Sequence, residues 1–132
     1  AGEPLGEALL APTRIYVKPL LQLLETVEVH ALAHITGGGL TENLPRVLPA
    51  GTAARIDTGS WPRPAVFKWL QEQGNIDDAE MLRTFNAGIG MVVCVSADEA
   101  EAASRCLEEA GETVHKIGEI VSNEGTAGVI YE

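Results

Sequence analysis

A run of three glycines, Gly37 to Gly39, is the first place where residue types and spacing point to ligand chemistry. It follows a segment with strand-like alternation and precedes Thr41, Glu42 and Asn43, which are typical of a helix start. Glycine lets the backbone approach a ligand and turn its N–H groups inward, and a helix N-terminus adds unpaired N–H groups with a partial positive charge. Such groups suit a phosphate or a carboxylate.

The glycine run does not belong to either common phosphate motif. No Lys-Ser or Lys-Thr pair follows it, so it is not a P-loop, and the G-x-G-x-x-G spacing of the dinucleotide fingerprint is absent from it. A tight strand-to-helix turn would need the same glycines for positive φ alone. The pattern therefore leaves two interpretations open, an anion site or a plain turn.

A second glycine-bearing bend lies at residues 84–90 (TFNAGIG). Asn86 carries both a donor and an acceptor, with which it could bind an amide or a hydroxyl group. Gly88 and Gly90 would allow a ligand to lie against the backbone. The alternative is a bulge at the entrance to a core strand.

The histidines do not predict a metal site. His30 and His34 are four residues apart, a spacing that could hold zinc on a helix. The alternation of residues 30–36 predicts a strand instead, where about 3.3 Å per residue separates the two side chains by roughly 13 Å. His34 borders the glycines and is either a ligand contact or an ordinary strand histidine.

No catalytic constellation can be assembled from the remaining reactive side chains. Asp77, Asp78 and Glu80 stand at a helix start, where acidic residues are more often caps than metal ligands. Cys94 lies in a predicted core strand, and Cys106 lies on a helix without a cationic group placed to activate its thiol. The catalytic residues therefore stay unassigned, and no metal ligand is predicted.

Hydrophobic periodicity predicts the elements that must position the two bends. We expect helices over residues 16–27, 65–73 (capped by Gly74), 77–83 and 97–110, a short one from residue 41, and strands over 30–36, 53–57, 91–95 (buried), 114–121 and 129–131. Interleaved helices and strands indicate a mixed sheet covered by helices. Residues 1–12 are expected to be a linker remnant that packs Leu9 and Leu10, and residues 13–132 a single domain.

Charge and composition exclude several classes of partner. The chain has 9 basic and 19 acidic side chains, a net charge of −10, which argues against nucleic acid and against an anionic membrane surface. No apolar run reaches the roughly 18 residues of a membrane span. Two cysteines and no secretory leader favour a reducing cytoplasm.

Several longer segments resemble one known family. They are PTRIYVKPLLQLLE (12–25), VHALAHITGGGLTENLPRVLP (29–49), the Trp61–Pro62 turn before VFKWLQEQGNI (66–76), EMLRTFNAGIGM (80–91) and HKIGEIV (115–121). In this order they resemble the phosphoribosylformylglycinamidine cyclo-ligases, also called aminoimidazole ribonucleotide synthetases. The resemblance runs from about Ala8 to Glu132 and covers only the C-terminal half of those enzymes.

The resemblance implies a fold and an activity. The fold would be α/β (α+β), a three-layer α/β/α unit with a mixed sheet, partly ferredoxin-like. The full-length enzyme would be a cytoplasmic homodimer that uses ATP to convert formylglycinamidine ribonucleotide to aminoimidazole ribonucleotide in purine biosynthesis. ATP and Mg²⁺ would be held mainly by the N-terminal half, which has no counterpart here, so the isolated chain would be inactive.

The resemblance also implies which residues bind substrate or phosphate. Carried over to this chain they are His34, Thr36, Gly37, Gly38, Gly39 and Asn43, with Asn86 and Gly88 as the facing wall. Ala87 departs mildly from the family pattern, which more often has a larger residue there. Two alternatives remain: another ATP-using member of the superfamily, such as a selenophosphate synthetase or thiamine-phosphate kinase, and a non-catalytic small-molecule sensor.

Overall fold

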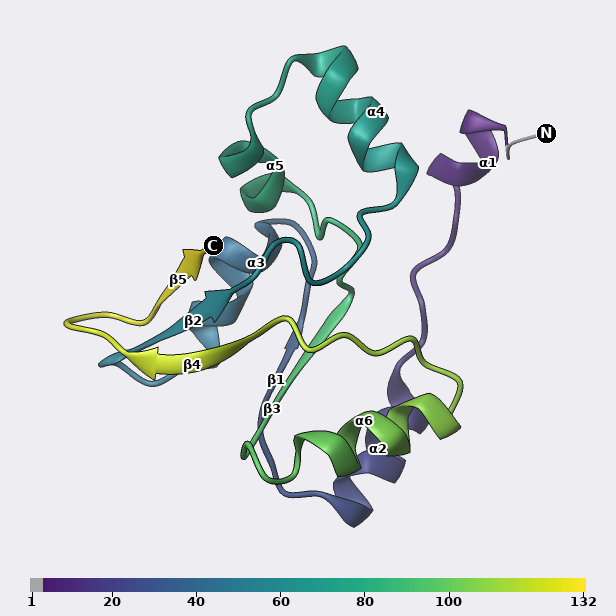
Figure 1. Cartoon of the computed structure of the whole chain (residues 1–132). Helices are drawn as coiled ribbons and strands as arrows, with labels where there is room; N and C mark the ends of the chain where they lie inside the picture. Colours follow the sequence, from purple (N-terminus) through teal and green to yellow (C-terminus); the bar gives the residue numbers. More distant parts are fainter. Residues whose placement is uncertain (1–3) are drawn as a thin grey trace.

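A ribbon of two antiparallel strands, β1 (Val29–His34) and β3 (Met91–Val95), crosses the middle of the molecule (Figure 1). The computed structural model describes residues 4–132. At one end of the ribbon His34 pairs with Met91, and the N–H of Ile35 donates to the carbonyl of Gly90 at 2.9 Å. Both glycine-bearing bends therefore leave from the same end of the ribbon.

The other strands form a separate three-stranded sheet in the order β4-β2-β5. The central strand β2 (Thr52–Ile56) pairs antiparallel with β4 (Gly118–Ser122) and parallel with β5 (Gly128–Tyr131). This sheet is mixed, as expected, and the predicted α/β class is confirmed.

The helices gather at the two ends of the ribbon (Figure 1). Helices α2 (Val17–Thr26) and α6 (Ala100–Glu109) pack side by side at one end. Helices α3 (Gly39–Asn43) and α5 (Asp78–Thr84) pack together at the other, and α4 (Ala65–Gly74) contacts α5. A 3₁₀ turn (Leu44–Arg46) continues α3, and the short α1 (Leu5–Leu9) touches α4.

The ribbon contributes residues to two hydrophobic clusters. The larger joins the ribbon to α3 and the three-stranded sheet, and its buried members are Ala33, Ile35, Leu40, Leu44, Ala54, Ile56, Trp61 and Ile89. The smaller joins the ribbon to the helix pair through buried Leu23, Val27 and Ala103. A β-bulge between Val29 and Ala31 inserts one extra residue in β1, so Val29 packs on the smaller cluster although Ala33 faces the larger one.

The main differences from the predicted elements lie at their ends. Helix α6 begins at Ala100 rather than residue 97, because Ser96 donates to the Glu99 side chain at 3.0 Å and closes a turn first. Helix α3 begins at Gly39, earlier than expected, and β4 begins only at Gly118. The prediction that Gly74 caps α4 is wrong, since the left-handed residue is Asn75 (φ 47°), which tolerates that conformation.

Two burial predictions were also wrong. Strand β3 is half-buried along its length because it is one strand of a two-stranded ribbon. In the segment expected to be a linker remnant, Leu9 and Leu10 are 54% and 83% exposed, so neither packs into a core. Residues 1–3 of that segment lie outside the described residues.

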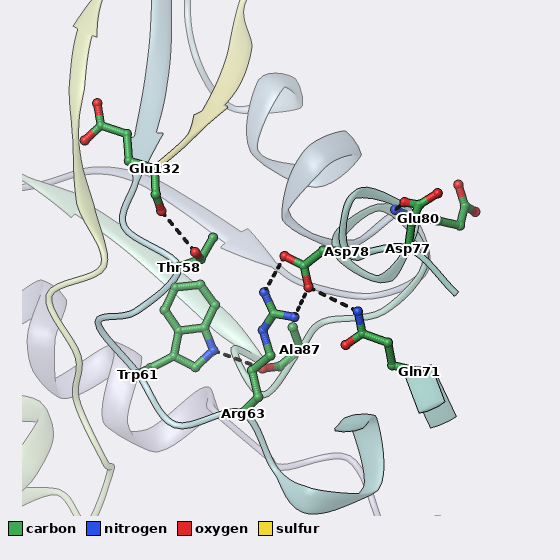
Figure 2. Close-up of polar contacts among 9 residues, drawn as sticks. All are labelled: Thr58, Trp61, Arg63, Gln71, Asp77, Asp78, Glu80, Ala87 and Glu132. Carbon is green, nitrogen blue, oxygen red and sulfur yellow. Dashed lines mark hydrogen bonds and ion pairs between the residues drawn. The ribbon is translucent and has the colours of Figure 1, made fainter. Parts of the chain in front are cut away.

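The segment before the second bend is fixed by polar contacts (Figure 2). The Asp77 carboxylate accepts from the N–H of Glu80 at 2.9 Å and caps α5, which confirms the capping interpretation for Asp77. Arg63 donates to Asp78 at 3.1 Å, and Gln71 donates to the same carboxylate from α4. These contacts join the Trp61–Pro64 turn and α4 to the start of α5.

We expect Asp77→Ala to lower the free energy of unfolding by about 1 kcal/mol, because the N–H of Glu80 loses its acceptor at the helix end. Urea denaturation of the 132-residue chain measures the change. Asp98→Ala is the control, since it removes the same charge from an exposed turn without a capping bond. Equal losses in the two variants would contradict the capping role.

The Arg63–Asp78 pair makes stability depend on pH. The hydrogen bond from Arg63 holds the pKa of the Asp78 carboxyl below its ordinary value, against the opposing effect of burial. Such a group stabilises the fold above its unfolded pKa, and the contribution is lost as pH falls through the folded pKa. The Asp78 side chain is 58% exposed, so solvent screening limits the contribution to less than about 1 kcal/mol.

We therefore expect the stability advantage of wild type over Asp78→Asn to be greatest near neutral pH and to disappear on acidification. Urea midpoints of both proteins, from about pH 7 to about pH 2, measure it. A stability advantage that grows as pH falls would contradict a lowered pKa of the Asp78 carboxyl in the folded protein.

Candidate functional site

The first glycine bend adopts a conformation that only glycine accommodates easily. Gly38 and Gly39 have φ values of 98° and 56°, in the left-handed region. A Cβ on Gly39 would lie 2.0 Å from the carbonyl oxygen of Leu82 and 2.6 Å from that of Phe85. The bend is therefore pressed against the C-terminal end of α5.

The buried side chain of Asn43 holds this bend from inside. Asn43 is 6% exposed, and its Nδ2 donates to the carbonyl oxygens of Thr36 (3.3 Å), Gly37 (3.3 Å) and Gly39 (2.8 Å). One side-chain amide thus binds three carbonyl groups of the same bend. Its role in the structure is to shape the bend.

This arrangement turns other backbone donors outward. In a planar trans peptide the C=O and N–H point in opposite directions, so a carbonyl directed at Asn43 directs the following N–H away from it. The N–H groups of Gly37 and Gly38 are turned outward in this way, and within residues 4–132 no backbone carbonyl accepts from either. Gly37 is exposed, and a Cβ on it would meet no atom within 4 Å. The bend presents two adjacent donors on its outer side, a geometry that suits an anion.

The second bend is stabilised largely by its own contacts. The Asn86 side-chain oxygen accepts from the N–H of Gly88 at 3.0 Å, and the Asn86 carbonyl accepts from Ile89 at 3.0 Å. The Trp61 indole donates to the carbonyl of Ala87 at 2.9 Å (Figure 2), and Ala87 itself has φ 52°. Asn86 therefore uses its acceptor on the turn and keeps its amide nitrogen as the group that could bind a ligand.

The structure brings the two bends together. Gly39 of the first lies against the carbonyl of Phe85, the residue that precedes Asn86 of the second. His34 is exposed at the adjoining end of β1, and its ring lies edge-on to Tyr16, with centroids 6.0 Å apart. All the site residues predicted from the sequence thus lie in these two bends or next to them.

Tyr16 is a neighbour of the site that the sequence did not suggest. A Cβ on Gly90 would lie 1.9 Å from the Tyr16 hydroxyl, so Gly90 leaves room for that ring. Partial burial and the charge of Glu112 raise the pKa of the Tyr16 hydroxyl. The ring therefore packs against His34 at the end of β1 that leads into the first bend.

Two charged residues at the mouth of the first bend were also missed. The Glu42 carboxylate lies over Gly38, with Oε2 3.0 Å from the Cβ position of that glycine. The other oxygen, Oε1, accepts from Nε of Arg83 at 3.1 Å. No spacing rule connects residues on α3 and α5, so only the packing of the two helices reveals the pair.

A hydroxyl network fixes the back of the bend. Thr41 donates to the carbonyl of Leu82 at 3.2 Å, so the Tyr131 hydroxyl is the donor in its 2.8 Å bond with Thr41. Burial raises the pKa of Tyr131. These two hydrogen bonds connect β5 to α3 and α5 next to the first bend.

Other parts of the chain offer less. Two shallow hollows, of about 310 and 300 Å³, lie between α2 and α6 and beside Lys116 at the end of the three-stranded sheet, and neither is lined by a bend residue. Among residues 4–132, no three His, Cys, Asp or Glu side chains gather as a metal site. No helix in that part of the chain combines the length and hydropathy needed to cross a membrane.

Known proteins resemble the chain over nearly its whole length. It is 62% identical over 121 residues to a phosphoribosylformylglycinamidine cyclo-ligase of Nitrosococcus oceani, covering 92% of this chain and 34% of that protein. It is 60% identical over 121 residues to the enzyme of the same name from Chromobacterium violaceum, covering 92% and 35%. Among solved structures, Escherichia coli HypE, a hydrogenase maturation protein, superposes with a TM-score of 0.67 at 25% identity, over 95% of this chain and 39% of that one.

The chain therefore spans about a third of the length of the curated relatives it matches. Residues 1–130 match the family described as AIR synthase related protein, C-terminal domain. Because this match covers almost every residue, the chain belongs to that family.

Proposed function

We propose that the chain is the substrate-side domain of a phosphoribosylformylglycinamidine cyclo-ligase, which closes an imidazole ring at the expense of ATP. The observation that carries the proposal is the 60–62% identity to two enzymes of that name. The 25% identity to HypE, a more distant member of the same fold, favours the cyclo-ligase over other superfamily activities.

The reaction needs an amide oxygen to become a leaving group. Transfer of the terminal phosphoryl group of ATP to the formyl amide oxygen of the substrate would release ADP. A ring-forming nitrogen would then attack that carbon, lose a proton, and expel the oxygen as inorganic phosphate, giving aminoimidazole ribonucleotide. The protein's tasks are to hold the reacting ends together and to stabilise charge on the phosphoryl group.

In this proposal the first bend receives a phosphate of the substrate or the phosphoryl group in transfer. The outward N–H groups of Gly37 and Gly38 are the donors, with the side chains of Thr36 and His34 at the edge. Gly39 and Asn43 act indirectly, because they fix the bend's shape.

The second bend forms the facing wall of the proposed site. Asn86 offers its amide nitrogen there, and Gly88 lets the bend pack against Pro64, since a Cβ at that position would lie 2.5 Å from the proline ring. No general acid or base is assigned.

The remaining parts of the proposal lie mostly outside this chain. ATP and Mg²⁺ would be bound chiefly by the rest of the full-length enzyme, and we assign no Mg²⁺ ligand and no step through the metal to these residues. The full-length enzyme would be a cytoplasmic homodimer.

Enzyme assays and calorimetry test the proposed function. The full-length protein should form aminoimidazole ribonucleotide and ADP from formylglycinamidine ribonucleotide and ATP, and the 132-residue chain alone should give no turnover. Calorimetry of the full-length protein should show binding of the ribonucleotide and none of free amino acids. A response to amino acids without one to the ribonucleotide would identify a sensor and refute the cyclo-ligase.

Gly37→Leu tests the bend without disturbing the fold. Its side chain would enter open space, so we expect the free energy of unfolding to change by less than about 0.5 kcal/mol. It would also cover the outward donors, and binding of ribose 5-phosphate, followed by NMR titration of the 132-residue chain, should weaken about tenfold or more.

The matched control is Gly6→Leu, which also enters open space but lies on α1. Unchanged binding in Gly37→Leu, or equal weakening in both variants, would remove the bend from the site.

A further inference from the structure

The mouth of the first bend already holds an anion, the side chain of Glu42. Its carboxylate lies beside Gly38, and both the carboxylate carbon (3.5 Å) and Oε2 (3.0 Å) are close to the Cβ position of that glycine. The side chain is 44% exposed, so solvent and ligands can reach it. A phosphate at the outward donors of Gly37 and Gly38 would therefore come within a few ångströms of this negative charge.

Arg83 is held beside the same mouth with most of its donors unused. Glu42 Oε1 accepts from Nε at 3.1 Å, and within the described part of the chain the guanidinium makes no other hydrogen bond or ion pair. The side chain is 62% exposed. The two Nη groups of a guanidinium form a planar fork that matches two oxygens of a phosphate, and they are free to do so here.

The pair contributes little to the fold. Exposed ion pairs of this kind are worth about 0–1 kcal/mol. Within residues 4–132, neither side chain belongs to a buried cluster, and neither makes a hydrogen bond or ion pair other than the one that joins them. The pair therefore adds little to stability. It lies against Gly38, beside the free N–H donors of the bend, and a ligand at those donors explains this position better than stability does.

We propose that Glu42 and Arg83 form an exchange pair at the phosphate site. Without ligand, the Glu42 carboxylate holds the Arg83 guanidinium beside Gly38. A phosphate bound at the bend takes that guanidinium through its free Nη groups, and Glu42 is displaced. Arg83 is then a binding residue, and Glu42 is a positioning residue that also competes with the anion. The inference rests on the proposed function, because it requires a phosphate at the bend.

The two residues should affect binding in opposite directions. Arg83→Gln should weaken binding of ribose 5-phosphate about tenfold or more, because a charge-assisted hydrogen bond is lost. Glu42→Gln should tighten binding about fivefold, because the carboxylate that competes with the phosphate for the Arg83 guanidinium loses its charge. Arg83→Lys should fall between Arg83→Gln and wild type, since it keeps the charge without the planar fork.

NMR titration of the 132-residue chain at fixed ionic strength, with ribose 5-phosphate and separately with inorganic phosphate, measures these changes. Arg105→Gln is the matched control, because it removes an exposed arginine from α6 at the other end of the ribbon. Its affinity should equal that of wild type. Inorganic phosphate should follow the same order as ribose 5-phosphate if the phosphate group alone is recognised.

The outcomes separate this inference from the function on which it rests. Equal weakening in Glu42→Gln and Arg83→Gln would mean that the pair merely supports the bend, and would overturn the exchange. Wild-type affinity in Arg83→Gln would also overturn it while leaving the bend as the phosphate site. Absence of binding by the wild-type chain to either probe would remove the phosphate site and the exchange pair together.

Discussion

The first bend depends on one constraint, the three hydrogen bonds that the amide of Asn43 donates to backbone carbonyls. Since peptide groups are rigid and planar, fixing the carbonyls on one side fixes the N–H groups on the other. The outward donors of the bend are a geometric result of this inward contact. The buried asparagine therefore determines the shape of the bend from its inner side.

Each of the three glycines meets a different physical requirement. Gly39 has no room for a side chain, because carbonyls of α5 lie against it. Gly38 has a backbone conformation that disfavours other residues, and it faces Glu42. Gly37 has neither restriction and borders open space. The plain-turn interpretation accounts for Gly38 and Gly39. It does not account for Gly37, where a glycine leaves the backbone open to approach by a ligand.

The sequence predicted the framework better than the details of the site. Alternation placed β1 to within two residues, and a short apolar run placed β3 at its observed bounds. The start of α6 was misplaced because a local side-chain bond, from Ser96 to Glu99, competes with the helix. The partnership of Glu42 with Arg83 depends on how α3 packs on α5, and no local pattern encodes that packing.

The β1–β3 ribbon has a consequence for the cooperativity of the domain. One of its surfaces contributes to the cluster around Ile35 and the other to the cluster around Leu23, so loss of the ribbon would disrupt both clusters. Melting of the α2–α6 pair would strip one surface of the ribbon and weaken the strand ends that carry the bends. The whole domain should lose its structure in a single transition, with no partly folded form that keeps the glycine loops ordered.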